Sequence, residues 1–336
     1  RGGREPGGPH RQREPARGRV TGGARAAVDP RNAVLLLDKP AGMTSAAVVG
    51  AVQRILQQRK IGHSGTLDKF ATGLLVLCTG GATKLTRFFL DGDKRYEGIA
   101  RLGVATDTDD GEGAVIARSV VGEIDDAALA SLRARFTGEM DQVPPRYSAL
   151  KVSGRRASDL MRRGDDVALA PRRVTVYSLE VRRVDGDPAA LRLTAHCSKG
   201  TYIRSLVRDM GEALGCGAHL EALRRTASGS FGIEQAVTLE ELHGGADRAA
   251  GAGRGWVSPF DALGGFGVLA VDDEGAGRVA NGAPFERRQV RSMEPSSSQR
   301  PYRVIDGANN MIAIAEVDSD NWTIRYVNVF KEENKW

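Results

Sequence analysis

The sequence predicts an α+β protein with a second, smaller β-rich domain at its C-terminal end. Residues 34–38 form an apolar run typical of a buried strand, and residues 44–56 follow with apolar side chains at helical spacing. Residues 266–336 carry short strand-like runs separated by Gly, Asp, Asn and Ser turns, which indicates a separate β-rich unit. The chain of 336 residues is also too long for one comfortable core.

Between these two regions, strand and helix patterns alternate. Residues 105–122 are acidic and rich in Gly, so we expect a loop there. Residues 245–256, rich in Gly and Ala, predict a linker. Helical spacing covers residues 82–90, 125–136 and 202–214, and strand patterns cover residues 94–104, 173–183 and 190–197.

The net charge of +6 is concentrated at the start of the chain. Residues 1–31 carry a net charge of +5, so the remaining residues carry about +1. Residues 1–30 are mostly Arg, Gly and Pro with almost no large apolar side chain, which predicts a disordered tail. Binding of a polyanion by the folded part must therefore depend on local patches.

Three widely spaced cysteines and the hydropathy pattern indicate the compartment. Cys78, Cys197 and Cys216 form no CxxC pair, which argues against a zinc site or a disulfide framework and for a reducing cytosol. No window approaches the roughly 18 consecutive apolar residues of a membrane span. No secretory signal pattern opens the chain. We therefore expect a cytoplasmic protein with no membrane contact.

A basic run is the first candidate for a polyanion-binding patch. Residues 146–173 contain eight basic residues against three acidic ones, which fits either an RNA-binding surface or an ordinary solvated face. The basic residues are Arg146, Lys151, Arg155, Arg156, Arg162, Arg163, Arg172 and Arg173.

The stretch most informative about chemistry is residues 62–73, which place His63 and Asp68 in one loop with three glycines. Glycine is used where a backbone turns tightly or approaches a ligand closely. A carboxylate in such a loop serves as a helix cap, metal ligand, general base or nucleophile. A metal site is disfavoured because no second His or acid stands at ligand spacing. The residues alone leave the other roles open.

The same stretch resembles the catalytic motif of the TruB family of tRNA pseudouridine synthases, G-H-x-G-x-L-D followed by A-T-G. Four further motifs of that family have similar counterparts here in the same order, and five ordered motifs over about 200 residues make coincidence a poor explanation. These counterparts are residues 38–45, residues 94–96 with 101–108, residues 144–151, and residues 197–204 with 223–226.

The resemblance implies a pseudouridine synthase fold, with a central mixed, mainly antiparallel sheet flanked by helices. It implies a catalytic domain over residues 31–248 that contains an RNA-binding insertion at about residues 105–172. Residues 249–264 would then be a linker, and residues 265–336 a small β-barrel of the RNA-binding type called PUA. The tail occupies residues 1–30.

Four catalytic residues follow from the resemblance. Asp68 takes the place of the catalytic carboxylate, and Arg204 that of the guanidinium that lowers its pKa and keeps it ionised. Tyr96 resembles the aromatic residue that stacks on the extruded uracil. Tyr202 resembles the second active-site tyrosine, which receives or relays the proton that leaves carbon 5.

Substrate contacts also follow from the resemblance. His63 would insert where the flipped base had been, Leu223 would line the pocket, and Lys39 belongs to the motif at residues 38–45. Arg146 and Lys151 would contact RNA phosphates, which position the RNA without reading its sequence. Asp107 or Asp110 belongs to the polar network around the nucleotide, and the sequence does not decide between them. No metal and no organic cofactor is implied.

The resemblance therefore predicts isomerisation of a uridine, position 55 in the T-loop of tRNA, to pseudouridine by a monomer with no obligate protein partner. The uridine must first leave its stack. One alternative is a guide-RNA-dependent enzyme of the dyskerin type, although residues 69–73 follow the stand-alone pattern. Another is a non-catalytic RNA-binding or chaperone factor. A hydrolase that uses His63 and Asp68 lacks a convincing nucleophile or metal set.

Overall fold

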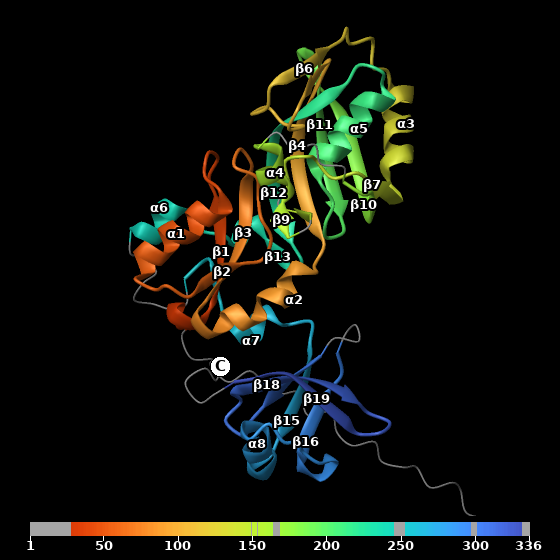
Figure 1. The fold of residues 1–336 in the computed structure, drawn as a ribbon. Helices are drawn as coiled ribbons and strands as arrows, with labels where there is room; N and C mark the ends of the chain where they lie inside the picture. Colours follow the sequence, from red (N-terminus) through yellow and green to blue (C-terminus); the bar gives the residue numbers. More distant parts are fainter. Residues whose placement is uncertain are drawn as a thin grey trace, which may run out of the picture.

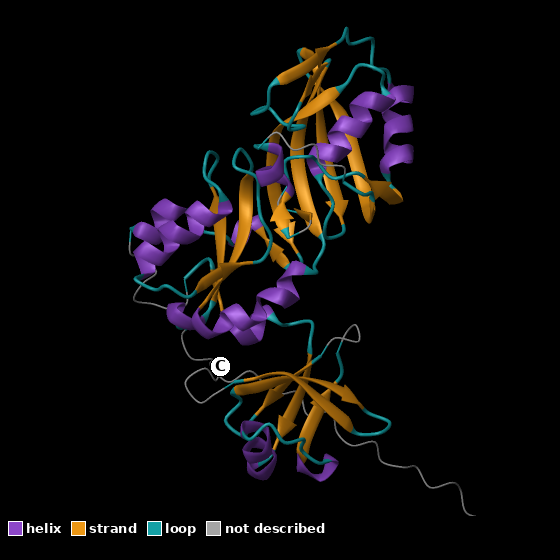
Figure 2. Cartoon of the chain, viewed as in Figure 1, coloured by secondary structure: helices purple, strands orange, loops and turns teal. Residues whose placement is uncertain are grey.

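A computed structural model describes residues 28–148, 150–152, 154–163, 169–244, 253–296 and 301–330. The chain forms two bodies, a large sheet with helices against it and a small C-terminal sheet (Figures 1 and 2). The predicted disordered tail lies outside the described residues as far as residue 27. Its predicted end at residue 30 is wrong, because Asp29 caps the short helix that begins at Pro30. Within the described part, none of the helices is long and apolar enough to cross a membrane.

The large sheet has ten strands, eight of them in one continuous path (Figure 1). Strand β2 (Ile61–His63) pairs with β3, and β13 (Phe231–Gly232) pairs with β12. In spatial order the path is β14 (Trp256–Val257), β1 (Val34–Lys39), β3 (Thr72–Thr79), β12 (Ala218–Ser228), β4 (Lys94–Leu102), β11 (Asp187–Cys197), β10 (Arg172–Val184) and β7 (Gly138–Gln142).

The sheet changes character at its centre. Strands β3 and β12 pair in parallel, with Thr72 opposite Arg224 and Gly73 opposite Arg225, whereas the other neighbours along the path are antiparallel. The loop that carries Asp68 leads directly into β3 at this parallel seam. The predicted mixed, mainly antiparallel sheet flanked by helices is therefore confirmed.

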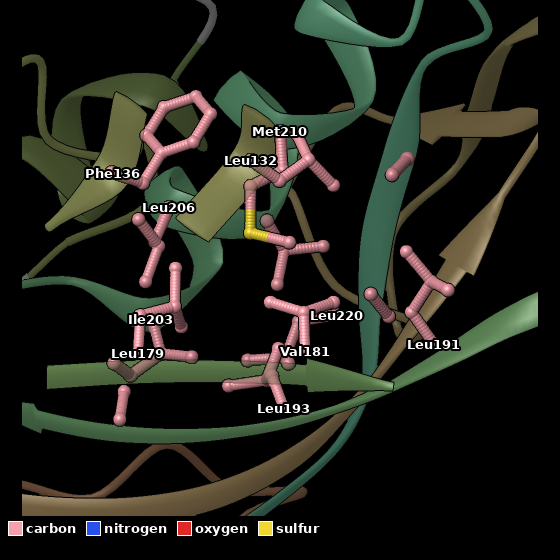
Figure 3. Packing of buried hydrophobic residues seen from close by; sticks show 14 of the residues in the cluster. Leu132, Phe136, Leu179, Val181, Leu191, Leu193, Ile203, Leu206, Met210 and Leu220 are labelled. Carbon is pink, nitrogen blue, oxygen red and sulfur yellow. The ribbon is translucent and has the colours of Figure 1, made fainter. Parts of the chain in front are cut away.

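Helices α3 (Asp126–Phe136) and α5 (Ile203–Ala213) cover one face of the C-terminal half of the sheet (Figure 3). The apolar stripe of α5 contacts alternate residues of β10 and β11, which point to the same face because side chains alternate along a strand. The opposite face of these strands is largely polar. This core includes Leu132, Phe136, Leu179, Val181, Leu191, Leu193, Leu206, Met210 and Leu220.

The N-terminal half of the sheet is buried on both faces, as the apolar run at residues 34–37 predicts. Helices α1 (Ser45–Leu56) and α6 (Leu239–His243) cover one face. On the other face lie η2 (Gly80–Leu85) and α2 (Thr86–Leu90), together with apolar residues of the C-terminal sheet. Helix α1 begins after Thr44, whose hydroxyl accepts from the Ala47 amide at 3.1 Å.

The C-terminal body is a five-stranded sheet ordered β16–β15–β17–β18–β19, which stands where the sequence predicts a small barrel. Phe266 joins the core of the large body and packs edge-on against Phe88, with ring centroids 5.2 Å apart. The elements of the C-terminal body are β15 (Gly267–Val271), α8 (Asp273–Ala280), β16 (Val290–Glu294), β17 (Tyr302–Ile305), β18 (Met311–Asp318) and β19 (Thr323–Val329). Helix α7 (Pro259–Ala262) precedes them.

Several elements differ from the expectation. The predicted loop at residues 105–122 is wrong in part, because it contains a hairpin of β5 (Val104–Thr106) and β6 (Val115–Arg118). Strand β12 was not predicted, since its charged residues interrupt the apolar pattern. The remaining short elements are η1 (Pro30–Asn32), β8 (Lys151–Val152), β9 (Arg155–Arg156), α4 (Ala157–Met161), η3 (Ile233–Gln235) and η4 (Arg287–Gln289).

Candidate active site

The Asp68 loop (residues 64–71) is fixed on both sides of the carboxylate. Leu67 and Ala71 are buried in the core that α3 and α5 cover. The Ser45 hydroxyl accepts from the Leu67 amide at 2.9 Å and lies 3.1 Å from the Leu67 carbonyl oxygen, to which it donates. Because its neighbours are anchored, the backbone of Asp68 has little freedom, and its side chain is presented at the seam between β3 and β12.

Arg204, at the start of α5, is the ion-pair partner of Asp68. Its Nη2 donates to Asp68 Oδ1 at 3.0 Å, and its Nε lies 3.0 Å from Oδ2. The Arg204 side chain is only 5% exposed, whereas that of Asp68 is 35% exposed. The guanidinium therefore sits beneath the carboxylate and leaves part of it open to a substrate. Two contacts of this kind fix both the position and the orientation of a carboxylate.

A second carboxylate, that of Asp110, shares the same guanidinium. Arg204 Nη1 donates to Asp110 Oδ2 at 3.2 Å and to the Thr108 carbonyl at 2.9 Å, while Nη2 also donates to the Tyr147 carbonyl at 3.1 Å. Asp107 instead accepts from the Ala114 amide at 2.8 Å, within its own hairpin. Of the two acids that the sequence left undecided, Asp110 is therefore the one in contact with Arg204.

The pKa of Asp68 is set by opposing effects. Burial raises the pKa of the carboxyl above its ordinary 3.8, and the neighbouring Asp110 charge acts in the same direction. The Arg204 guanidinium and the Lys39 ammonium oppose the rise. Without these cations the carboxyl would hold its proton to a higher pH. Arg204 thus favours the ionised form of Asp68, the form that acts as a nucleophile or base.

Two tyrosines lie within electrostatic reach of Asp68. Burial raises the pKa of both the Tyr96 and the Tyr202 phenol, and the Asp68 charge adds to the rise in each case. Both phenols therefore keep their protons at neutral pH. Tyr96 extends from β4 toward the core side of the sheet, where Leu223 of β12, 8% exposed, is also found. Both tyrosines are therefore near enough to Asp68 to respond to its charge, and Leu223 belongs to the core against which Tyr96 packs.

Tyr202 is held by a residue that the sequence analysis missed. Gln142 lies at the end of β7. Its Nε2 donates to the Tyr202 carbonyl at 3.1 Å, and its Oε1 accepts from the Tyr202 amide at 2.8 Å. Gln142 is 2% exposed and takes the place of a side-chain cap at the start of α5. Sequence patterns gave no signal for it, because the contact joins residues 60 positions apart.

His63 lies on β2, just before the Asp68 loop. Burial and then the Arg225 charge lower the pKa of its imidazole, so the ring is neutral at physiological pH. Its Nδ1 is buried and has no hydrogen-bond partner among the described residues.

Lys39 is placed differently from the other predicted substrate contacts, because its side chain is fully buried. Its ammonium donates to the carbonyls of Pro40 at 2.8 Å, Met43 at 2.6 Å and Lys69 at 3.3 Å. Burial lowers its pKa to about 8, while the Asp68 charge opposes the shift. In this structure Lys39 therefore joins the motif at residues 38–45 to the Asp68 loop from below.

The two predicted phosphate contacts lie on the segment that approaches Arg204. Arg146 is exposed and directly precedes Tyr147, whose carbonyl accepts from Arg204. Lys151 begins β8, and its side chain lies outside the described part of the structure. Among the described residues, no group of three or more His, Cys, Asp or Glu side chains is placed to hold a metal ion.

Comparison with known proteins identifies the family. Residues 53–203 match the N-terminal domain of the TruB family of pseudouridylate synthases, and residues 204–262 match the C-terminal domain of tRNA pseudouridylate synthase B. The chain is 43% identical over 286 residues to the tRNA pseudouridine synthase B of Cupriavidus metallidurans, covering 84% of this chain and 90% of that protein. The chain belongs to the TruB family.

A further relative and the solved structures agree with this family assignment. The tRNA pseudouridine synthase B of Thiobacillus denitrificans is 44% identical over 300 residues, covering 88% of this chain and 94% of that protein. In a crystal structure of a Cbf5–Nop10–Gar1 complex, one chain matches with a TM-score of 0.68 and 25% identity, covering 90% of this chain and 84% of that one. A chain of an archaeal box H/ACA Nop10–Cbf5 complex matches with a TM-score of 0.66, 22% identity, and coverage of 92% and 94%. This TruB family member therefore has the pseudouridine synthase fold.

Proposed function

We propose that the protein is a stand-alone tRNA pseudouridine synthase that isomerises uridine 55 in the T-loop. The observation that carries the proposal is the Asp68 carboxylate, partly open on one side and held by the buried Arg204 on the other. The relatives named tRNA pseudouridine synthase B, with 43% and 44% identity over most of their length, support tRNA as the substrate.

In the proposed reaction the uridine leaves its stack and enters the space above Asp68. The bond between C1′ of the ribose and N1 of uracil breaks, the base turns, and C1′ bonds to C5. The C5 proton is lost and N1 gains a proton, so the product is an isomer and no redox partner is needed. Asp68, ionised, supplies the negative charge that acts on the electron-poor carbon.

The remaining site residues have supporting roles in the proposal. Tyr96 stacks on the flipped base, Leu223 lines the pocket beneath it, and Tyr202, which remains a phenol at neutral pH, takes part in the proton transfer from C5. His63, a neutral ring, fills the space that the base vacates. Arg146 and Lys151 contact phosphates of the T-arm. Lys39 acts on the Asp68 loop, because its ammonium is occupied by three carbonyls.

The proposal also assigns a role to each segment of the chain. Residues 31–248 form the catalytic domain with its RNA-binding insertion at about residues 105–172, residues 249–264 the linker, and residues 265–336 a PUA-like domain that binds RNA. The tail, residues 1–30, is an N-terminal extension that the proposed reaction does not use. The protein acts as a monomer in the cytoplasm, without an obligate protein partner, metal or cofactor.

The test is to incubate the purified chain alone with an unmodified tRNA transcript and to map pseudouridine by chemical labelling and primer extension. We expect one pseudouridine in the T-loop, formed without guide RNA or any second protein. Binding of the transcript without any pseudouridine would support the chaperone alternative instead. Modification only after a guide RNA is added would support the dyskerin-type alternative.

A further inference from the structure

Arg225 is a buried arginine beside the site to which no role has been given. Its side chain is 1% exposed and is the largest of the fully buried side chains in the described structure. It lies on β12, directly opposite Tyr96 of β4 in the strand register. Side chains opposite each other on antiparallel strands point to the same face with Cβ atoms about 5 Å apart. Arg225 therefore extends into the layer that holds Tyr96.

The guanidinium of Arg225 contacts backbone carbonyls. Its Nε donates to the Leu74 carbonyl of β3 at 2.7 Å, and its Nη2 donates to the Gly65 carbonyl of the Asp68 loop at 3.4 Å. Within the described residues no Asp or Glu is paired with it, whereas Arg204 contacts two carboxylates. One side chain on β12 thus joins the loop that carries Asp68 to the strand that follows it.

The same guanidinium lies next to the Tyr96 phenol, because Arg225 and Tyr96 stand opposite each other on neighbouring strands. Burial raises the pKa of Tyr96, and Arg225 opposes the rise through its charge and a side-chain hydrogen bond. An arginine has five N–H donors in a rigid planar fork, so it can serve acceptors in several directions at once. A lysine in the same place is a single point charge on a flexible stem and cannot reproduce the fork.

The position of Arg225 relative to the loop is fixed at the backbone as well. Gly73 has φ of +104°, and a Cβ at this glycine would lie 2.3 Å from the Arg225 carbonyl oxygen. The parallel seam therefore closes only because residue 73 has no side chain. With β12 held this tightly against β3, the Arg225 fork is presented to Gly65 and Tyr96 at a constant distance.

We propose that Arg225 is a positioning residue that fixes the Asp68 loop, at Gly65, and the phenol of Tyr96 in one arrangement. The carboxylate and the stacking ring then meet a flipped base together. This inference rests on the proposed function, because Asp68 and Tyr96 are its reacting and stacking groups. It differs from the role of Arg204, which contacts the Asp68 carboxylate directly.

The first experiment compares the wild-type protein with Arg225→Lys and with a matched control, Arg224→Lys. Arg224 lies on β12 next to Arg225, but its side chain points to the other face of the sheet. It is 40% exposed and contacts Asp38 of β1. In single-turnover assays on a T-arm hairpin we expect Arg225→Lys to lower the rate about 10- to 100-fold, since small misplacements of reacting groups have losses of this order. RNA affinity and the Arg224→Lys rate should stay within about threefold.

A double variant separates positioning from a structural contribution. If Arg225 acts partly through the phenol, Arg225→Lys causes a smaller loss in a Tyr96→Phe background than in the wild type. The proposal would be overturned if the rate loss of the double variant equalled the product of the two single rate losses. It would also be overturned if Arg225→Lys had a rate within twofold of wild type and only a lower Tm. Failure of the wild-type protein itself to form pseudouridine would count against the proposed function instead.

A second readout needs no turnover. With 13C-labelled tyrosine, the titration of the Tyr96 phenol can be followed by NMR in the wild type, in Arg225→Gln and in the control Arg224→Gln. We expect the Tyr96 pKa to rise in Arg225→Gln and not in Arg224→Gln, because Arg225 faces Tyr96 across the two strands and opposes the rise in its pKa, whereas Arg224 points to the other face of β12. An unchanged Tyr96 titration in folded Arg225→Gln would also overturn the proposal.

Discussion

Two buried arginines reach the Asp68 loop from different elements, a helix and a strand, and their surroundings differ. Arg204 comes from α5 and contacts the carboxylates of Asp68 and Asp110, besides two carbonyls. Arg225 comes from β12 and donates to the carbonyls of Leu74 and Gly65. Both are at most 5% exposed, so water and salt screen these two charges far less than charges at the surface.

The difference separates two tasks that one residue type can perform. A guanidinium against carboxylates sets their charge state, because it stabilises the ionised form. A guanidinium that contacts only backbone carbonyls does not change the charge state of any partner. It instead fixes the position of the backbone around it. Substitution of Arg204 should therefore change the charge state of Asp68, whereas substitution of Arg225 should change the geometry of the loop that carries it.

Among the supporting residues, the largest loss is expected at Arg204. In Arg204→Gln, Asp68 and Asp110 lose the cation that lies between them, so the pKa of Asp68 rises and less of it is ionised at pH 7. Breaking a buried pair destabilises the fold by about 3–5 kcal/mol. For the reaction we expect a rate loss of about 10²- to 10³-fold, because less Asp68 is ionised and the carboxylate is placed less accurately. Single-turnover pseudouridine formation measures it. Raising the pH should restore part of the Arg204→Gln rate. A rate loss below about threefold would contradict the role of Arg204 as the partner that keeps Asp68 ionised.

A smaller loss is expected at Asp110. Asp110→Asn keeps a polar side chain next to Arg204 but removes the charge that raises the Asp68 pKa. We expect a rate loss of about tenfold from looser placement of Arg204. The acid limb of the pH profile should move to lower pH. Asp107→Asn, whose carboxylate caps its own hairpin, is the matched control and should stay within about twofold. Equal losses in both variants would contradict the assignment.

The pH dependence of the wild type tests the charge state of Asp68 directly. Activity needs the ionised carboxylate, and the pKa of Asp68 in the folded protein is raised above 3.8. The rate should therefore be full at neutral pH and should fall as the pH drops through a value above 3.8. Single-turnover rates from pH 3 to 8 give this value, provided that the fold persists, which circular dichroism checks. A plateau that extends below pH 3.8 would contradict the raised pKa.

The smallest effect is expected from the N-terminal tail. Removal of residues 1–27 should leave kcat within about twofold, because that segment matches none of the active-site motifs. The boundary matters, since the Pro30 carbonyl accepts from Thr79 Oγ1 at 2.8 Å and Asn32 Oδ1 accepts from the Gly81 amide at 2.7 Å. Removal of residues 1–32 should instead lower Tm. A large loss of kcat in the shorter truncation would assign the tail a role in turnover.

The sequence predicted the active site best where short motifs contain the reacting residues. The loop around Asp68 and the helix that presents Arg204 were both expected, and the structure brings the two side chains together across 136 positions. The parallel seam was not expected, because Glu221, Arg224 and Arg225 hide the strand pattern of β12. Its pairing with β4 on one side and with β3 on the other identifies it as a strand.

Residues that act through the backbone were the hardest to predict. Gln142 holds Tyr202 by two main-chain hydrogen bonds, and Lys39 holds three carbonyls, so neither contact leaves a side-chain pattern in the sequence. The choice between Asp107 and Asp110 likewise depended on the path of the β5–β6 hairpin. Long-range register decides such contacts, and local propensity does not encode it.

The most direct test of the account is to measure pseudouridine formation and RNA binding by Asp68→Asn on the same T-arm hairpin. The substitution preserves the volume of the side chain and removes the charge that Arg204 holds. The account predicts RNA affinity within about threefold of the wild type and no detectable pseudouridine, a loss of at least about 10³-fold. Wild-type turnover by Asp68→Asn would show that the chemistry depends on another group.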